Sequence, residues 1–271
     1  MFEVYNQQVN LVLKCLPIVA KTINFALKGG TAINMFIRDQ YPRLSVDIDL
    51  CYLPIQPRDE SLLGIETGLL EIMENLESAF AYKIAKIRNA TTKTITKLLV
   101  DNSIVEIKIE PNLILRGTVY PIVYQNTSKV VNELYALPVY DMPLLAREEI
   151  YAGKICAALD RQHPRDLFDI KFILEEGITD RTKNAFLVYL ISHNRPMHEL
   201  LIPNSLDQAD AYTNEFAGMT DLNISYAEMA EVREKLIQTI KTDPALVFRT
   251  SRLNYLLENN HVKSYTLHLG I

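Results

Sequence analysis

The sequence lacks features that are typical of membrane proteins, zinc-binding modules and strongly basic nucleic-acid-binding proteins. In its 271 residues no apolar run reaches the roughly 18 residues that a membrane-spanning helix needs. The three cysteines are far apart and show no metal-binding spacing. Basic residues number 28 and acidic residues 33, and the resulting net charge of −5 argues against a uniformly basic surface.

The same absences predict a compartment. The first residues include Glu3 and no basic segment of the kind that opens a secretory signal. We therefore expect Cys15, Cys51 and Cys156 to be buried thiols in a reducing compartment, and we predict a cytoplasmic protein. A hydrophobic content of 48% and a charged content of 23% are ordinary for a globular chain of one large or two modest domains.

The hydrophobic pattern divides the chain into a mixed half and a helical half. The first half predicts helices over 5–24, 31–38 and 59–79, and strands over 25–27, 46–52, 82–88, 94–100, 104–110 and 119–124. The second half predicts helices over 143–160, 164–176, 180–193, 206–217, 225–241 and 244–258, and one strand over 262–269. This order predicts an α/β (α+β) fold with two domains, 1–142 and 143–271.

Two acidic residues share one predicted strand, in the segment Ser45-Val46-Asp47-Ile48-Asp49-Leu50. Side chains two apart on a strand point to the same face, so Asp47 and Asp49 project together. Adjacent carboxylates repel each other, and a hard cation such as Mg²⁺ removes that repulsion. The pair predicts a metal site for phosphoryl or nucleotidyl transfer; the alternative is two surface acids on an amphipathic strand.

A glycine pair precedes this strand, in Leu27-Lys28-Gly29-Gly30-Thr31. Glycine lets the backbone approach a ligand closely, and a helix that starts there offers N–H groups to a phosphate. Thr31 adds a hydroxyl and is the expected helix cap. The spacing matches neither a P-loop nor a dinucleotide-binding fingerprint. A plain tight turn is therefore the alternative to a triphosphate cradle that faces Asp47 and Asp49.

A third metal ligand is expected on a neighbouring strand. In Val105-Glu106-Ile107-Lys108-Ile109-Glu110, the alternation places Glu106, Lys108 and Glu110 on one face. Glu110 and Glu106 are both candidates to complete the metal site. The alternative is an exposed ladder of glutamate and lysine.

Basic and acidic residues also gather around a predicted break between two helices. Lys154 and Arg161 are seven residues apart on the first helix, hence on nearly one face. His163-Pro164 favours a break, and Asp166 and Asp169 lie one turn apart on the second helix. One interpretation places Lys154 on nucleotide phosphates, with Asp166 or Asp169 holding Lys154, Arg161 or an incoming hydroxyl. The other is two helices joined by Arg–Asp salt bridges, with Lys154 exposed.

Residues 81–100 form a basic segment without an acid. Its basic residues are Lys83, Lys86, Arg88, Lys93 and Lys97. They predict a solvated strand face, a lysine-protected sheet edge or a patch that contacts phosphates.

Two segments resemble the signatures of one enzyme family. LKGGTAINMFIRDQYPRLSVDIDL resembles the opening motif of the AbiEii/AbiGii-type nucleotidyltransferases, a Gly-Gly-Ser/Thr turn followed by Ser-x-Asp-x-Asp on the next strand. EEIYAGKICAALDRQHPRDLFDIKFIL resembles the family's second signature, which here consists of Lys154, Arg161, Arg165, Asp166 and Asp169. The resemblance covers residues 27–50 and 148–174, in the family's order, and no motif over 180–271.

The resemblance implies a fold and a biological setting. It implies a polymerase β-like nucleotidyltransferase domain with a mixed sheet over 1–142, and a helical-bundle domain over 143–271 that closes the nucleotide cleft. Family members are toxins of type IV-like toxin–antitoxin or phage-defence systems, encoded beside a cognate antitoxin. Their MenT-type relatives transfer nucleotides to the 3′ end of tRNA.

The resemblance also implies roles for individual residues. Asp47 and Asp49 would bind Mg²⁺, with Glu110 or Glu106 as the third ligand. The implied nucleotide-binding residues are Gly29, Gly30, Thr31, Ser45, Lys154, Arg161 and Asp166, and the implied catalytic residues are Asp47, Asp49, Lys154 and Asp169. We expect an RNA hydroxyl to attack the α-phosphate of an NTP. The alternatives are a small molecule or protein hydroxyl as acceptor, or a non-catalytic nucleotide-binding interaction protein.

Overall fold

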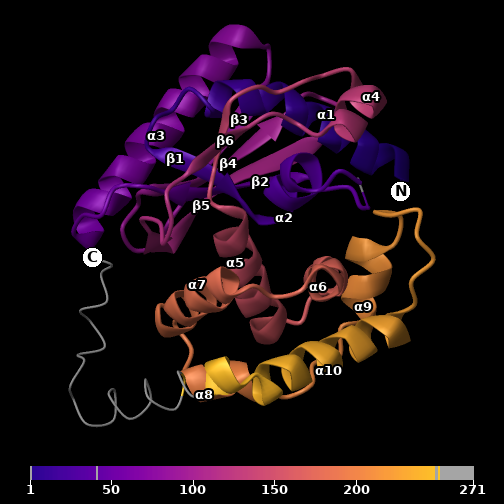
Figure 1. The fold of residues 1–271 in the computed structure, drawn as a ribbon. Coiled ribbons are helices and arrows are strands. Elements are labelled where there is room, and N and C mark those ends of the chain that lie inside the picture. The colour runs from indigo at the N-terminus through magenta and orange to yellow at the C-terminus, as the bar shows by residue number, and fades with distance from the viewer. Residues whose placement is uncertain (1, 41, 248–249, 251–271) are drawn as a thin grey trace. The chain divides into compact units, whose positions relative to one another are not determined.

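The structure is a computed structural model and describes residues 2–40, 42–247 and 250 (Figure 1). Its contacts define two compact units, Met1–Ile150 with Gly218–Asp221, and Tyr151–Ala217 with Leu222–Ile271. The predicted strand over 262–269 and the end of the predicted helix over 244–258 lie outside the described residues. None of the described helices is long and apolar enough to cross a membrane.

The first unit is built on a seven-stranded sheet with the order β3-β4-β5-β2-β1-β7-β6. The strands are β1 (Phe25–Lys28), β2 (Asp47–Tyr52), β3 (Lys83–Arg88), β4 (Ile95–Asp101), β5 (Glu106–Arg116), β6 (Val123–Gln125) and β7 (Met142–Leu144). β2, the predicted carboxylate strand, lies inside the sheet, antiparallel to β1 and parallel to β5. The predicted α/β fold with a mixed sheet is confirmed.

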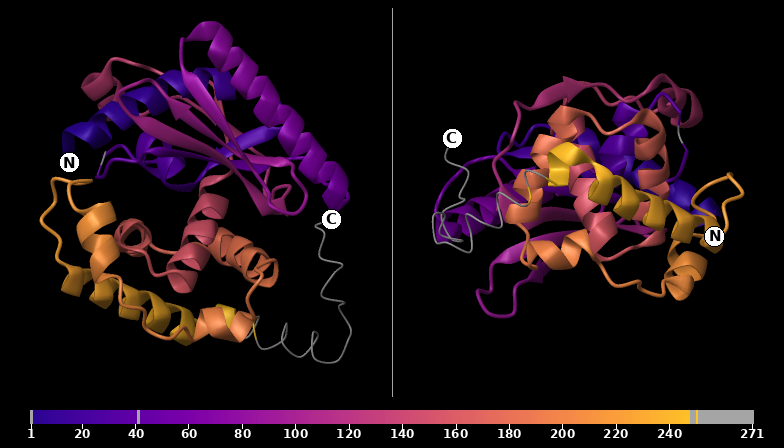
Figure 2. Two further views of the ribbon diagram at one scale, coloured as in Figure 1. Left: turned by 180° about the vertical axis from the view of Figure 1, so that it is seen from behind. Right: turned by 60° about the horizontal axis from the view of Figure 1, so that its bottom comes forward.

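Two helices, α1 (Phe2–Val19) and α3 (Arg58–Ala79), pack on each other and against strands of this sheet. The left view of Figure 2 shows both helices beside the strands, α1 in blue and α3 in purple. Apolar residues of α3 and β4, such as Leu69, Leu98 and Val100, are fully buried. Along β5 buried residues alternate with exposed Glu106, Lys108 and Glu110. One face of the sheet is therefore the core, and the other carries the predicted site residues. The short helix α4 (Lys129–Tyr135) was not predicted.

The helix after the glycine pair differs from its prediction. α2 (Gly29–Ala32) begins at the first glycine and continues as a π-helical turn, η1 (Ile33–Ile37). The prediction that Thr31 caps this helix is wrong. Gly29 adopts a φ of +72°, which glycine tolerates, and the chain enters the helix two residues earlier than predicted.

The region around residue 142 also differs from its prediction. The helix predicted from residue 143 starts at Arg147, and Met142–Leu144 form β7 instead. β7 runs parallel to β1 and antiparallel to β6. The strand escaped prediction because it is three residues long and contains Pro143, which cannot donate a backbone hydrogen bond.

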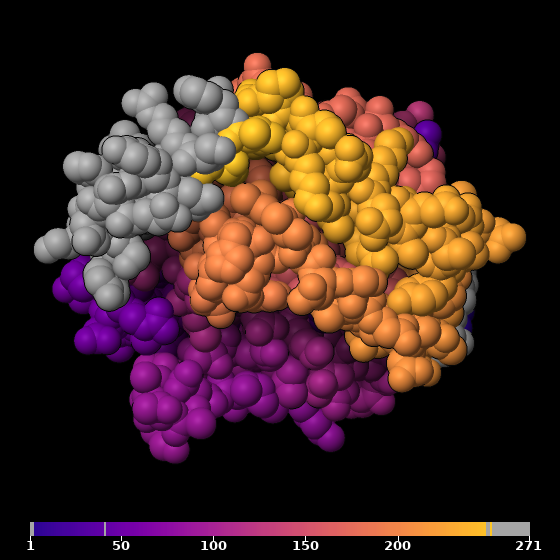
Figure 3. Space-filling view, turned by 90° about the horizontal axis from the view of Figure 1, so that it is seen from below, coloured from indigo at the N-terminus to yellow at the C-terminus, as the bar shows by residue number. Residues whose placement is uncertain are grey.

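The second unit is helical. Its elements are most of α5 (Arg147–Asp160), then α6 (Pro164–Glu176), α7 (Asp180–Ile191), α8 (Met197–Leu201), α9 (Ala209–Ala211), the π-helical η2 (Tyr212–Phe216) and α10 (Tyr226–Thr242). α10 packs against α6 and α8, and Figure 3 shows it in yellow. It begins with a capping box between Ser225 and Glu228. The three cysteines are buried, as predicted.

Candidate active site

The glycine turn lies directly against the carboxylate strand. Lys28 at the end of β1 is the antiparallel partner of Asp49 on β2. A Cβ atom added to Gly29 would collide with the Asp49 carboxylate, so only glycine leaves room for this contact. The turn and the acidic pair, which the sequence predicted to face each other, are thus in contact.

A second contact joins the turn to the segment before β2. A Cβ atom added to Gly30 would lie 2.5 Å from Arg43 Nη2 and 2.9 Å from Ser45 Oγ. Ser45 was a candidate from the family motif. Arg43 was not singled out in the sequence, although it lies four residues before Asp47 on the same segment, at the alternating spacing of Ser45, Asp47 and Asp49.

Thr31 joins the turn to the segment that contains Ser45 and Asp47. Its hydroxyl, which is buried, lies 2.5 Å from the backbone carbonyl oxygen of Asp47 and 3.0 Å from Ser45 Oγ. Asn34, one turn further on, donates to the carbonyl oxygen of Gly30 at 2.9 Å. These bonds fix the turn against the strand that carries the two acids.

The two acids share one face of β2, where both are half-buried between buried neighbours. The parallel register of β2 and β5 pairs Asp47 with Lys108 and Asp49 with Glu110. Glu110 is half exposed, and its Oε2 lies 2.9 Å from Lys97 Nζ. Glu106 lies further back along β5, before the first residue paired with β2. Of the two candidates for a third ligand, only Glu110 is adjacent to the acidic pair.

The donor set suits Mg²⁺ better than a metal that needs an all-protein cage. Among the described residues, no group of three or more His, Cys, Asp or Glu side chains is arranged to hold a metal ion. Mg²⁺ characteristically uses one or two carboxylates and completes its shell with water and substrate phosphates. Asp47 and Asp49 provide two such carboxylates on one face, beside a glycine turn.

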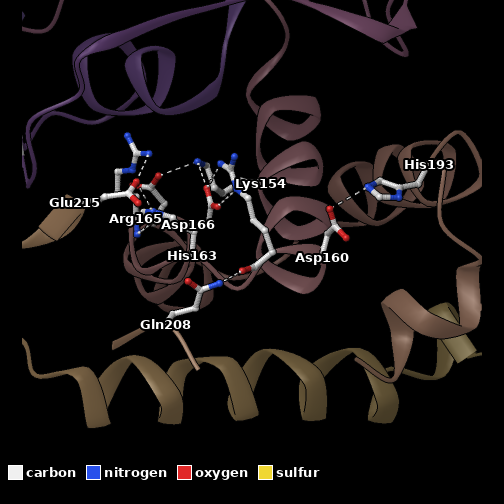
Figure 4. Close-up of polar contacts among 10 residues, drawn as sticks. Lys154, Asp160, His163, Arg165, Asp166, His193, Gln208 and Glu215 are labelled. Carbon is white, nitrogen blue, oxygen red and sulfur yellow. Dashed lines mark hydrogen bonds and ion pairs between the residues drawn. The ribbon is translucent and has the colours of Figure 1, made fainter. Parts of the chain in front are cut away.

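A buried ion-pair cluster occupies the interface of α5 and α6 (Figure 4). Lys154 Nζ lies 2.8 Å from Asp166 Oδ1 and 3.1 Å from Asp169 Oδ2. Both carboxylates are fully buried, and Lys154 is 7% exposed. The alternative in which Lys154 is an exposed lysine is therefore wrong. Burial alone would raise the pKa of Asp166, but the charges of Lys154 and Arg161 outweigh it and hold that pKa well below its usual range.

Arginine and histidine residues surround this cluster. Arg161, 58% exposed, donates from Nε to Asp166 Oδ2 at 2.5 Å. Arg165 and His163 both contact Glu215 Oε2, at 3.5 and 3.1 Å. His163 also caps α6, because its Nδ1 accepts a hydrogen bond from the backbone N–H of Arg165. Burial, reinforced by the charge of Arg165, lowers the pKa of His163 below its usual value.

One buried acid was missed in the sequence. Glu149, in the first turn of α5, is 1% exposed and accepts hydrogen bonds from the backbone N–H groups of Val119 and Tyr120, at 3.0 and 3.2 Å. It lies inside the second family signature, but the sequence alone does not show that it is buried, because glutamate is usually exposed. Glu149 ties the start of α5 to the loop that follows β5.

The predicted basic segment does not form one patch. Pairing of β3 with β4 places Lys83 and Lys97 on the face that carries Asp47 and Asp49. Arg88 pairs at 3.2 Å with Glu66 of α3, which packs on the core face. The Lys97–Glu110 pair further reduces the free positive charge beside the acids.

Cys15 and Cys51 are poorly suited to act as nucleophiles. Burial raises the pKa of the Cys51 thiol, on β2, to about 12, and does the same for Cys15. Thiols with such pKa values stay protonated at neutral pH and are poor nucleophiles. The candidate site residues are therefore the two acids of β2, the glycine turn and the cluster around Lys154.

The mixed sheet, the carboxylate pair and the glycine turn fit the class of protein that the sequence predicted, a nucleotidyltransferase. The chain belongs to the AbiEii family: the family model for the nucleotidyl transferase AbiEii toxin of type IV toxin–antitoxin systems matches residues 11–245. Among solved structures, the chain is similar to MenT4, a nucleotidyltransferase toxin from Mycobacterium tuberculosis H37Rv. The two are 15% identical, and the match has a TM-score of 0.67 and covers 89% of this chain and 86% of MenT4. No curated protein sequence matches the chain.

Proposed function

We propose that this nucleotidyltransferase toxin transfers a nucleoside monophosphate from an NTP to a hydroxyl of an RNA, in a Mg²⁺-dependent reaction. The 3′ end of tRNA is the acceptor that we test first. The observation that carries the proposal is the contact between the glycine turn and Asp49. This contact supports the proposal, because a glycine turn lets a phosphate approach the backbone closely and paired carboxylates suit a divalent cation. The predicted alternative of two unrelated surface acids does not explain this contact.

The roles of the residues follow from their places. Asp47 and Asp49 would hold Mg²⁺, with Glu110 at the edge of its shell. Mg²⁺ would supply positive charge that stabilises the transferring and leaving phosphates. The turn Gly29–Thr31 would bind the triphosphate through its backbone, with Ser45 behind it. The acceptor hydroxyl attacks the α-phosphorus, and the bond to the bridging oxygen of pyrophosphate breaks.

The second family signature supplies the remaining roles. We propose that Lys154 binds the nucleotide phosphates as a point charge. Asp166 and Asp169 would hold its ammonium group, and Arg161 would share Asp166 with it. In this proposal Asp169 is essential because it orients Lys154, which it contacts at 3.1 Å.

The domain roles and the partners are part of the proposal. We propose that residues 1–142 form the catalytic domain and 143–271 a helical domain, and that the protein acts in the cytoplasm. The family implies an antitoxin as counterpart, and we propose phage defence as the setting in which the toxin acts. On the sheet face that carries the acids, Lys83 and Lys108 are exposed and are our candidates for contacts with RNA phosphates.

A transfer assay tests the proposal. The protein is incubated with each α-labelled NTP, total cellular RNA and Mg²⁺, and the RNA is then sequenced at its 3′ ends. We expect one NTP to label RNA, EDTA to abolish the labelling, and Asp49→Asn to be inactive but folded. Labelling of a small molecule or a protein instead would change the acceptor. Absence of transfer and of Mg²⁺-dependent NTP binding by calorimetry would favour a non-catalytic protein.

A further inference from the structure

Four residues at every second position run along the segment that faces the glycine turn: Arg43, Ser45, Asp47 and Asp49. Asp49 approaches Gly29, while Ser45 and Arg43 approach Gly30. Asp47 accepts the Thr31 hydroxyl through its backbone carbonyl. The row thus carries two acids at one end and a cation at the other, along the length of the turn.

Arg43 is a buried residue and not a surface arginine. It is 4% exposed, and its Nη1 donates to the backbone carbonyl of Leu44 at 2.9 Å. Its Nη2 lies where a side chain at residue 30 would begin, 2.5 Å from the position of a Cβ atom. Burying a cation is costly, and such a residue is generally retained for a specific geometric or electrostatic role.

A segment from much later in the chain fixes the backbone on both sides of Arg43. Met219 accepts a hydrogen bond from the Leu44 N–H at 2.6 Å through its carbonyl oxygen. The Thr220 hydroxyl donates to the carbonyl oxygen of Pro42 at 2.5 Å. Both residues belong to Gly218–Asp221, the segment that returns to the first unit. These two bonds hold the backbone on both sides of Arg43, so its side chain extends towards Gly30 from a fixed position.

We propose that Arg43 is a positioning residue of the nucleotide site. Its guanidinium packs against Gly30 and thereby holds the turn in place. It also adds a positive charge next to the turn, where the triphosphate would bind. This inference rests on the proposed NTP site at the turn. The positive charge favours binding of the negatively charged triphosphate. The planar guanidinium, together with Ser45, fills the space next to Gly30. Arg43 acts through the turn, so it affects binding of the NTP and not binding of the acceptor.

Steady-state kinetics separate this role from a merely structural one. The variants are Arg43→Lys, which keeps the charge, and Arg43→Met, which removes it. Arg58→Met is the matched control, because Arg58 is an exposed arginine of the same unit that also donates to a backbone carbonyl, that of Leu113. We expect KM for the NTP to rise about tenfold or more in Arg43→Met and less in Arg43→Lys. KM for the acceptor stays unchanged, and Arg58→Met behaves as wild type.

A thermodynamic cycle tests the contact without using activity. Thermal midpoints are measured for Gly30→Ala, Arg43→Lys and the double variant, with Arg58→Met combined with Gly30→Ala as control. We expect the Gly30→Ala loss to be smaller when Arg43 is replaced, since the shorter lysine head leaves room, and to be unchanged by Arg58→Met. Additive losses, or an unchanged KM for the NTP in both Arg43 variants, would overturn the inference. If wild type shows neither NTP transfer nor NTP binding, the proposed function fails. Non-additive losses in thermal midpoint would in that case still establish the contact between Gly30 and Arg43.

Discussion

Gly29 and Asp49 lie so close together that one added carbon atom on Gly29 would occupy the space of the Asp49 carboxylate. Gly29 directly follows β1 and begins α2, and Asp49 lies on β2, whose antiparallel register with β1 ends at the pair Lys28 and Asp49. Sheet pairing, the positive φ of Gly29 and the hydroxyl of Thr31 all act to keep the turn beside the acids. This arrangement makes the chemistry of Asp49 dependent on a residue that has no side chain.

Gly29→Ala should therefore disable the site. The added Cβ displaces the Asp49 carboxylate, and we expect transfer activity to fall by about 100-fold or more. Gly177→Ala is the control, because Gly177 also has a positive φ, +88°, but nothing lies within 4 Å of its Cβ position. Both variants should lose about 1 kcal/mol of stability from backbone strain. Equal activity in the two variants, measured by labelled transfer, would contradict this reasoning.

A pair of glutamate variants distinguishes the third ligand. Glu110 is adjacent to Asp49 in the β2–β5 register, whereas Glu106 lies outside it. We expect Glu110→Gln to raise the Mg²⁺ concentration needed for half-maximal activity several-fold, and Glu106→Gln to leave it unchanged. Lys97→Met serves as a further control, because it removes the partner of Glu110 without removing a carboxylate. A larger effect from Glu106→Gln would reverse the assignment.

The buried cluster between α5 and α6 should be sensitive to the loss of its central acid. Asp166→Ala leaves the ammonium group of Lys154 with one carboxylate fewer in a buried setting, and breaking a buried pair costs about 3–5 kcal/mol. Arg161→Ala should cost under about 1 kcal/mol, because the arginine side chain is mostly exposed. Urea denaturation midpoints test the order of the two. A greater loss of stability from Arg161→Ala than from Asp166→Ala would show that the buried cluster does not stabilise the packing of α5 against α6.

The cap of α6 predicts a pH dependence. Because the pKa of His163 is lowered in the fold, the unfolded chain binds more protons there below about pH 6.5, and stability falls as the pH drops. Protonated Nδ1 also cannot accept the N–H of Arg165. Besides Arg165, the charged groups facing His163 are Asp166 and Glu215.

His163→Asn keeps a capping side chain that does not titrate. We expect wild type to lose more in thermal midpoint than this variant between pH 7.5 and 5.5. The difference between the two should stay constant above about pH 7.5, where the histidine is neutral in both states. A difference that stays the same down to pH 5.5 would exclude His163 as the titrating group.

The sequence predicted elements with a clear period and missed those held by tertiary contacts. The two-residue alternation of Val46, Ile48 and Leu50 is a local property of a strand buried on one face, so the orientation of the acids was predictable. β7 has no such period, because only its place between β1 and β6 makes it a strand. The early start of α2 depends on the conformation of Gly29, which no local pattern specifies.

The same distinction holds for the site. The glycine pair and the aspartates are recognisable from their spacing in the sequence, and β1, which ends just before Gly29, pairs with the strand that carries Asp47 and Asp49. Arg43 and Glu149 were passed over because an arginine or glutamate is usually exposed, and only the fold shows that both are buried. The Met219 and Thr220 bonds to the segment before β2 join residues more than 170 positions apart, as the pair Thr220 and Pro42 shows. No reading of local sequence predicts a contact of that kind.

The most direct test of the account is metal binding at the carboxylate pair. Mn²⁺, which can replace Mg²⁺ and is detected by electron paramagnetic resonance, is titrated into wild type, Asp47→Asn and Asp49→Asn in the presence of an NTP analogue that cannot be cleaved. We predict that wild type binds Mn²⁺ with the nucleotide, and that each variant binds at least tenfold more weakly while its thermal midpoint is retained. Equally tight binding by wild type and a folded Asp47→Asn/Asp49→Asn double variant would contradict the account.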